Sequence, residues 1–276
     1  MDFLSLRHTL SGDSPESYTV SLVQPNLSLI LPAFNEAGRI AGTIAEAVRY
    51  FEERSCTYQI IVAADGDDGT REIVAGLRRE NPCLVVIGAP ARRGKGLGIR
   101  EAVRLATGRV IGFADADNKV PIDEYDKCAP LLAAGCPVVI GTRAVARSRI
   151  ERPQPWYRRV GARGFRIFMQ NATGLRDISD TQCGFKFFQH DVARQIFGLQ
   201  KIDGYMFDVE ILLLARRLGL EIREVPIRWR DDGDSRLNLV RGNLRNVRDI
   251  LSIRRETRAA VASMTARATT STLGQG

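Results

Sequence analysis

The sequence predicts an α/β fold built on an open, mainly parallel β-sheet with helices on both faces. From Leu27 onward, short apolar runs alternate with longer segments whose apolar residues recur at helical spacing. The apolar runs are continuous, which is typical of parallel strands that are buried on both faces. Polar residues directly follow five of these runs, and ligands of open α/β sheets bind at that end of the strands.

The first half of the chain alternates strand and helix. Residues 27–34 read as a strand, and Ile40, Ile44 and Phe51 then recur at helical spacing. Asp68 is a candidate N-cap for the next helix, which should stop before a proline. The expected strands are 27–34, 58–64, 83–89, 109–114 and 137–142, and the expected helices are 35–53, 68–81, 94–108 and a segment around 125–135.

The alternation breaks in the second half. Residues 143–164 contain seven arginines and show no steady period, so we expect an exposed loop that leads into a helix near 165–174. The sequence then predicts a helix within 203–219, a strand within 221–229 and an arginine-rich C-terminal helix. We divide the chain into a polar lead-in, an α/β domain, a basic amphipathic helix and a flexible tail, over 1–26, 27–235, 236–262 and 263–276.

The composition limits the classes of protein to consider. Of the 276 residues, 44% are hydrophobic and 26% are charged, which is ordinary for a soluble globular protein. We expect neither a membrane span nor a secretory signal, because no apolar run is long enough. Five cysteines without paired spacing and two histidines argue against a zinc centre and indicate reduced thiols in the cytosol. The net charge of +8 favours an anionic partner: nucleic acid, a phosphorylated substrate or an anionic membrane surface.

Two aspartates, Asp115 and Asp117, follow the expected strand 109–114. Residues two apart in an extended chain share a face, so both carboxylates lean toward one point, where their like charges repel each other. A divalent cation removes that cost, and Mg²⁺ takes one or two carboxylates together with phosphate oxygens and water. We therefore consider a site for Mg²⁺ or Mn²⁺ on these residues. The alternative is a polar turn with two solvated aspartates.

The basic segment RRGKG, residues 92–96, opens the expected helix 94–108. Its glycines let the backbone approach a phosphate, the helix N-terminus favours an anion, and Lys95 or Arg93 can neutralise it. The alternative is a solvated basic turn. The spacing does not fit a Walker A loop, and no GxGxxG follows the first strand, which argues against a dinucleotide-dependent dehydrogenase.

Five short motifs, taken in order, carry a resemblance to a known family. LILPAFNEAGRI, IVAADGDDGT, RRGKGLGIREAV, FADADN and VIGTR resemble the family 2 glycosyltransferases of GT-A fold, over residues 27–246. DTQCGFKFF, GYMFDVEILLLA and EVPIRWRDDGDSRLN are similar to the dolichyl-phosphate glucosyltransferases and mannosyltransferases, and the glucosyl type is closer. The resemblance implies a Rossmann-like sheet with acceptor-side elements in the C-terminal part of the chain.

The resemblance also implies roles for individual residues. On the side of the nucleotide sugar, Pro32, Ala33 and Glu36 match the segment for the nucleoside, Asp65 matches a residue near the base, and Lys95 lies in the nucleotide-side loop. Asp115 and Asp117 match the residues for the sugar and the metal-bound diphosphate, and Arg143 matches an arginine after the fifth strand. Ser235 and Arg236 match a segment that closes over the diphosphate. On the acceptor side, Gln182 matches a residue that contacts the acceptor. Asp180, Lys186 and Asp208 also match acceptor-side positions, and we expect these three residues to serve catalysis.

Two positions depart from the family pattern. Ala64 replaces the first of two paired aspartates in a loop that is one residue shorter, which leaves the choice of base open. Asn118 and Lys119 follow the Asp115–Asp117 pair where mannosyl enzymes have Leu-Gln, which weakens a mannosyl assignment.

We expect an inverting enzyme that moves a hexose, glucose before mannose, from UDP-glucose or GDP-mannose to a polyprenyl or dolichyl phosphate. A metal on Asp117, with Lys95 and Arg236, would stabilise the leaving diphosphate. A phosphate acceptor needs no base. The alternative acceptor, a soluble or polymeric hydroxyl, needs a general base to take its proton, and Asp208 is the candidate for that base. The other interpretation of Asp208 is a negative charge that stabilises the N-terminus of a helix through the helix dipole. No nucleic-acid partner is expected, because no such motif is present and acidic strand ends repel phosphate.

Two basic segments bear on a membrane. The expected C-terminal helix has an apolar face beside an arginine face, which fits either an interfacial helix or a helix packed on the domain. The apolar face consists of Val240, Leu244, Val247 and Leu251, and the arginine face consists of Arg241, Arg245 and Arg248. The segment RPQPWYRR suits a headgroup layer or an ordered loop, and Arg158, Arg159 and Arg163 are candidates to hold the acceptor phosphate. We expect a cytoplasmic protein, with peripheral attachment at the inner face of the membrane as an open alternative.

Overall fold

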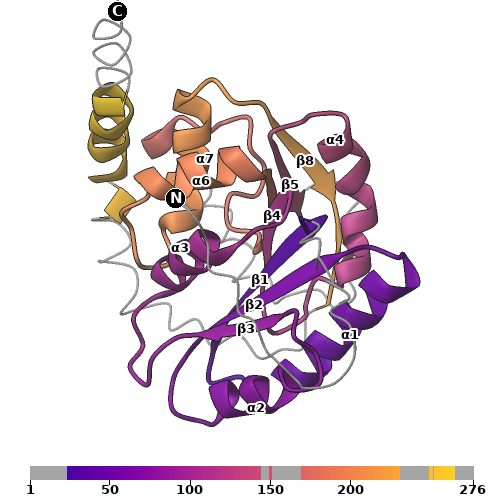
Figure 1. Ribbon diagram of the computed structural model, residues 1–276. Coiled ribbons are helices and arrows are strands. Elements are labelled where there is room, and N and C mark those ends of the chain that lie inside the picture. Colours follow the sequence, from indigo (N-terminus) through magenta and orange to yellow (C-terminus); the bar gives the residue numbers. More distant parts are fainter. Residues whose placement is uncertain (1–23, 144–148, 151–168, 231–248, 251, 265–276) are drawn as a thin grey trace, which may run out of the picture.

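A seven-stranded sheet forms the centre of the molecule, as a computed structural model shows (Figure 1). The structure describes residues 24–143, 149–150, 169–230, 249–250 and 252–264. The strand order is β3-β2-β1-β4-β7-β5-β8, and β6 pairs with β9 in a separate parallel ribbon. The strands are β1 (Leu27–Phe34), β2 (Tyr58–Asp65), β3 (Leu84–Ile87), β4 (Val110–Ala114), β5 (Val138–Thr142), β6 (Arg149–Ile150), β7 (Phe185–Gln189), β8 (Ile222–Pro226) and β9 (Arg228–Trp229).

Strand β7 is antiparallel to both of its neighbours, β4 and β5. The other six strands of the sheet therefore run in one direction, and the prediction of a mainly parallel sheet is confirmed. Gly112 of β4 stands opposite Phe187 of β7, and a Cβ atom on Gly112 would lie 2.1 Å from the Phe187 ring. A glycine in the middle of β4 thus makes room for the aromatic strand beside it.

Helices cover both faces of the sheet, as Figure 1 shows. The alternating residues Leu27, Leu29 and Leu31 of β1 pack on one layer, while Ile30 packs on the other. The first layer contains α1 (Ile40–Glu53), α2 (Thr70–Leu77), the 3₁₀ helix η1 (Ile122–Lys127) and α4 (Ala129–Ala133). The second layer contains α3 (Lys95–Leu105), α6 (His190–Leu199), α7 (Phe207–Arg217) and the helical residues 252–264.

Helix α2 begins one residue later than a cap at Asp68 predicts, because Gly69 occupies the N-cap position with a φ of 90°. Asp68 still closes the first turn, since its Oδ1 accepts a hydrogen bond from the Thr70 backbone N–H at 3.1 Å. Its Oδ2 accepts a second bond from the Ala37 N–H at 2.8 Å. Asp68 therefore ties the end of β1 to the start of α2.

The C-terminal helix packs its apolar side against the second layer. Ile250 and Ile253 are fully buried there, whereas Arg254, Arg255 and Arg258 are exposed. The apolar and arginine faces proposed for residues 240–248 and Leu251 lie outside the described residues. The same holds for much of the lead-in and the tail, so the four-part division of the chain stays a prediction.

Candidate active site at the carboxyl edge of the sheet

Strands β1 to β5 end at the same edge of the sheet, and the order of the strands reverses between β1 and β4. Helix α1, which follows β1, covers one face, and α3, which leads into β4, covers the other. The two connections diverge from this point, which is where open α/β sheets bind ligands. Asp115 and Asp117 lie just beyond the end of β4 and therefore occupy this position.

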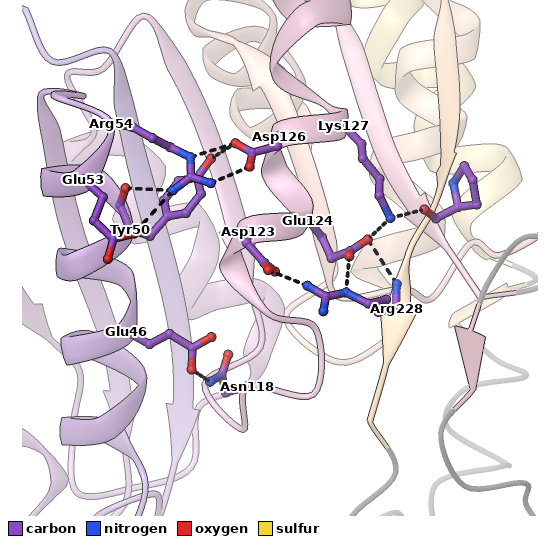
Figure 2. Close-up of polar contacts among 11 residues, drawn as sticks. Glu46, Tyr50, Glu53, Arg54, Asn118, Asp123, Glu124, Asp126, Lys127 and Arg228 are labelled. Atoms are coloured by element: carbon purple, nitrogen blue, oxygen red, sulfur yellow. Dashed lines mark hydrogen bonds and ion pairs between the residues drawn. The ribbon is translucent and has the colours of Figure 1, made fainter.

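The turn that carries the two aspartates is fixed to helix α1. The hydroxyl of Thr43 donates a hydrogen bond to the buried Ala116 carbonyl at 2.9 Å. Asn118, which has a φ of 55°, donates from its side-chain amide to Glu46 of α1 at 2.7 Å, as Figure 2 shows. These two bonds hold the turn against α1, and the Asp115 and Asp117 side chains remain 43% and 27% exposed.

Lys95 reaches this turn from the first position of α3. Its Nζ lies 2.6 Å from Asp115 Oδ1, and its side chain is 16% exposed. Burial lowers the pKa of Lys95, but the charges of Asp115 and Asp208 outweigh burial and raise the pKa above its ordinary value. The start of α3 is in turn fixed by the Asp203 carbonyl, which accepts the Gly96 N–H at 2.8 Å. Lys95 is therefore a fixed positive charge beside the acidic turn.

The two aspartates fit a divalent cation. Burial raises the pKa of Asp117, and the nearby charge of Asp115 raises it further, while the charges of Lys119 and Lys95 oppose that rise. The two carboxylates therefore repel each other, although Lys95 pairs with Asp115 and Lys119 pairs with Asp117. Within the described residues, no cluster of three or more acidic, histidine or cysteine side chains could hold a metal. Mg²⁺ and Mn²⁺ accept one or two carboxylates when phosphate oxygens and water complete the shell, so Asp115 and Asp117 suffice beside a diphosphate.

Gly184 gives the Asp115 side chain its space. A Cβ atom on Gly184 would lie 2.1 Å from Asp115 Oδ2, and the Asp115 N–H donates to the Gly184 carbonyl at 3.1 Å. We expect Gly184→Ala to displace the carboxylate and to lower kcat about 100-fold, because small misplacements of positioning groups have effects of that size. Steady-state kinetics would measure this. The matched control is Gly42→Ala in α1, where a Cβ meets nothing within 4 Å.

A wild-type kcat for Gly184→Ala would show that Asp115 does not need this space. Circular dichroism and thermal melting of both variants separate a local effect from unfolding. Gly42→Ala should be slightly more stable than the wild type, because alanine favours a helix by about 1 kcal/mol over glycine.

Arg143 and Asp180 form a second ion pair at the same edge. The guanidinium donates to both carboxylate oxygens, from Nε at 2.7 Å and from Nη2 at 3.0 Å. Burial raises the pKa of Asp180, but the charge of Arg143 together with its side-chain and backbone hydrogen bonds outweighs burial and holds the pKa below its ordinary value. Glu224 of β8 accepts the backbone N–H groups of Ser179 and Asp180. Asp180 therefore sits in a fixed loop and orients Arg143.

Lys186 and Asp208 form a third pair, which is buried. Lys186 points from the middle of β7 and is fully buried, and its Nζ lies 2.5 Å from Asp208 Oδ1 and 2.5 Å from the Cys183 carbonyl. Asp208 occupies the first turn of α7 with its side chain 4% exposed. Burial raises the pKa of Asp208, and the charges of Lys186 and Lys95 oppose that rise. The pair thus links β7 to α7 from inside the protein.

Asp65, at the end of β2, is occupied by its own neighbours. Its carboxylate accepts the Ala89 N–H at 3.2 Å, the Arg93 N–H at 2.7 Å and Arg93 Nε at 3.0 Å. Arg92, the next residue back, stacks on Phe34 at 4.4 Å and donates to the exposed Tyr205 hydroxyl at 3.1 Å. The basic segment therefore closes over the ends of β1 and β2.

Residues 28–197 match the sequence profile of glycosyl transferase family 2. The match spans more than half of the chain and contains the Asp115–Asp117 turn, Lys95 and the Arg143–Asp180 pair. The chain belongs to glycosyltransferase family 2.

Two relatives extend the likeness of this family 2 glycosyltransferase beyond the profile. A dolichyl-phosphate beta-glucosyltransferase of Drosophila melanogaster is 33% identical over 241 residues, which cover 82% of this chain and 74% of the relative. One from Trichomonas vaginalis is 31% identical, over 82% of this chain and 70% of the relative. Among solved structures, glucosyl-3-phosphoglycerate synthase from Mycobacterium tuberculosis with Mn²⁺, UDP-glucose and phosphoglyceric acid has a TM-score of 0.59 at 20% identity, over 83% of this chain and 79% of that chain. That likeness supports the GT-A fold.

The described residues bring most of the expected site residues of the glycosyltransferase to one edge. Gln182 lies in the turn between Asp180 and β7 and is partly exposed. Pro32 and Ala33 belong to the last half of β1, and Glu36 follows it, with its N–H bonded to the Thr70 hydroxyl at 3.0 Å. The expected residues that lie outside the described ranges are Arg158, Arg159, Arg163, Ser235 and Arg236. Their roles stay predictions.

Sequence reasoning missed several residues that shape this site. Gly184 could have been suspected, because a glycine directly precedes a strongly apolar strand. Glu46 and Thr43 gave no such signal, because both lie within an ordinary amphipathic helix.

No helix in the described part of the enzyme combines the length and the apolar character that crossing a bilayer requires.

Proposed function

We propose that this glycosyltransferase moves glucose from UDP-glucose to a polyprenyl or dolichyl phosphate. The observation that carries the proposal is the likeness to dolichyl-phosphate beta-glucosyltransferases over 82% of the chain, which continues past the family 2 profile into the acceptor-side elements. Asn118 and Lys119 after the aspartates weaken a mannosyl assignment, because the mannosyl enzymes that this sequence resembles have Leu-Gln at these positions.

We propose that the donor lies across the carboxyl ends of β1, β2 and β4. Pro32, Ala33 and Glu36 would line the nucleoside, and Asp65 would fix the loop beside the base through its bonds to Arg93. Lys95 and Arg143 bring two positive charges to the diphosphate, and the segment that contains Arg236 is proposed to add a third. Placing the cationic groups in advance stabilises charge on the leaving diphosphate without reorganisation of the site.

We propose that Asp115 and Asp117 hold Mg²⁺ or Mn²⁺ together with the diphosphate. The support is the hard-oxygen donor pair, the mutual repulsion of its charges and the space that Gly184 leaves beside it. The bound metal supplies Lewis-acid stabilisation of the leaving group. Lys95, which is paired with Asp115, is proposed to stabilise the negative charge that develops on the leaving diphosphate.

The acceptor phosphate is already an anion at neutral pH, so transfer requires no general base. One of its oxygens attacks the anomeric carbon as the bond from that carbon to the diphosphate oxygen breaks, and the nucleoside diphosphate leaves. Inversion follows from attack opposite the leaving group. Asp208 is buried and paired with Lys186, so we propose that both act by positioning β7 and α7, as Asp180 does for Arg143. Gln182, with Arg158, Arg159 and Arg163, would face the acceptor phosphate.

We also propose peripheral contact with an anionic membrane surface. Arg254, Arg255 and Arg258 are exposed on the helix 252–264. Burial lowers the pKa of the nearby Arg217, and the charges of Arg258 and Arg254 lower it further. Such a cluster of like charges is relieved by anionic headgroups.

The test is parallel incubation with UDP-glucose and GDP-mannose, Mn²⁺ and a short polyprenyl phosphate, followed by mass spectrometry of the extracted lipid. The expected product is the hexosylated lipid phosphate from UDP-glucose. Free polyprenol serves as the hydroxyl acceptor, and a further arm presents the lipid phosphate in vesicles with and without anionic lipid. Transfer to the polyprenol but not to its phosphate would refute the proposal.

A further inference from the structure

A buried carboxylate lies outside the donor site, on the helix that follows the Asp115–Asp117 turn. Glu124 of η1 has a side chain that is 3% exposed. Its Oε1 accepts Arg228 Nε at 2.6 Å, and its Oε2 accepts the Arg228 backbone N–H at 3.1 Å (Figure 2). Lys127 also donates to Oε2, and Asp123 pairs with the other side of the same guanidinium. Glu124 thus holds both the backbone and the side chain of Arg228.

The segment that Glu124 holds touches the donor site on two sides. The Trp229 ring lies 5.7 Å from the guanidinium carbon of Arg143. The Arg230 N–H donates at 2.9 Å to the carbonyl of Lys119, two residues after Asp117. Lys127, the other partner of Glu124, donates to the Pro226 carbonyl at 3.2 Å. One buried carboxylate therefore fixes a strand that contacts both the acidic turn and Arg143.

A gain in stability is a weak explanation for this arrangement. Removing the Glu124 carboxylate from water is costly, and the side chains of its partners Arg228 and Lys127 remain 35% and 46% exposed, where solvent weakens the attraction that would offset this cost. A fixed geometry is the property that such a pair supplies and an apolar contact does not. The carboxylate accepts three directed hydrogen bonds from Arg228 and Lys127, which fixes the course of the chain.

We propose that Glu124 is a positioning residue for glycosyl transfer, which holds Arg228 so that Trp229 and Arg230 keep Arg143 and the Asp115–Asp117 turn in place. This inference rests on the proposed function, because it assigns those groups to the donor. Glu124 touches no substrate in this proposal and acts through the β8–β9 segment.

The same helix offers a control carboxylate, Asp126, whose side chain is 49% exposed. Asp126 of η1 also binds an arginine bidentately, since Arg54 donates from Nε at 3.0 Å and from Nη2 at 2.6 Å, and Tyr50 donates to it at 2.7 Å. Tyr50 belongs to α1 and Arg54 directly follows that helix, and Figure 2 shows both on the other side of η1 from Arg228. The Asp126 pair fastens the helix without touching the β8–β9 segment.

The experiment compares Glu124→Gln with Asp126→Asn, by steady-state kinetics and thermal melting. Glutamine keeps an oxygen acceptor for Arg228, so Glu124→Gln should fold. We expect it to lower kcat about 10- to 100-fold with a change in donor KM below threefold, since misplaced groups affect the transition state most. Asp126→Asn should leave kcat within about twofold of the wild type. The double variant Glu124→Gln/Arg228→Met should be no slower than Glu124→Gln, because the two residues act as a unit.

Equal losses of kcat in Glu124→Gln and Asp126→Asn, or a lower melting temperature with unchanged kcat, would overturn the proposal. Arg228→Lys, at a half-exposed position, provides a second variant, and a wild-type kcat there would also overturn it. Hydrolysis of the nucleotide sugar by water is measured in parallel. If the wild type hydrolyses the donor but transfers nothing to lipid phosphate, the proposed function fails while the variant-to-wild-type ratio still tests Glu124.

Discussion

Replacing Lys186 by methionine should lower the free energy of unfolding by about 3–5 kcal/mol, because it leaves the buried Asp208 carboxylate without its closest cation. The side chain of Lys186 is fully buried, and that of Asp208 is 4% exposed. Methionine fills most of the volume of the lysine stem, so the loss reports the charge rather than a cavity. Urea unfolding of the variant and the wild type, followed by circular dichroism, measures the difference.

The loss should depend on pH in a defined direction. Burial already raises the pKa of Asp208, and removal of the Lys186 charge raises it further. A carboxyl group whose pKa is raised by folding destabilises the fold as the pH rises above its unfolded value, near 4. The deficit of Lys186→Met relative to the wild type should therefore grow from pH 4 to pH 8. A deficit that is constant over this range would contradict the assignment of the effect to Asp208.

Two further variants test whether the loss of stability comes from the unpaired Asp208 charge. Lys186→Met/Asp208→Leu removes both charges and should recover a large part of the lost stability, because an uncharged pair carries no desolvation penalty. Lys201→Met, at an exposed position, should change the free energy of unfolding by less than about 0.5 kcal/mol.

Replacing Asp117 by asparagine should lower kcat about 1000-fold and leave the fold intact. The variant removes a charged ligand from the proposed metal and diphosphate site, and a loss of about 4 kcal/mol of charge stabilisation corresponds to that factor. Because the side chain is 27% exposed and its pKa is already raised by burial and by Asp115, the neutral amide should be tolerated. Initial rates at saturating UDP-glucose measure the effect.

The metal dependence separates this effect from a general loss of activity. EDTA should abolish transfer by the wild type, and Mn²⁺ should restore it. Asp117→Asn should need a higher Mn²⁺ concentration for half of its own maximal rate. Asp191→Asn, an exposed acidic position in the first turn of α6, serves as the control and should keep wild-type kinetics. An unchanged Mn²⁺ requirement in Asp117→Asn would remove this residue from the metal site.

Local sequence patterns predicted the helices and strands that have a clear hydrophobic period, but they did not predict which strands lie next to each other in the sheet. The apolar runs at β1 to β5 and the amphipathic segment of α1 were readable because each is a contiguous signal. Strand β7 was recognised only as a motif, because Lys186 interrupts its apolar run at a buried position. Its place between β4 and β5 depends on long-range packing, such as that of Phe187 on Gly112.

The same distinction holds for the site. The strand-end rule correctly grouped Lys95 with Asp115, because both follow parallel strands. The contact of Glu124 with Arg228 joins residues 104 positions apart, and although Arg228 lies in the segment EVPIRWRDDGDSRLN, Glu124 stands in no motif that points to it. Such pairs follow from the register of the whole sheet, which a single sequence does not contain.

The reversed strand β7 has a consequence for the order of assembly during synthesis. Strand β5 leaves the ribosome more than forty residues before β7, yet it has no place beside β4 until residues 185–189 arrive. A nascent chain that ends before residue 185 carries an open edge on β4 and an unpaired β5, which is the kind of exposed strand that invites wrong pairing. The sheet beyond β4 is therefore completed only when the chain supplies β7.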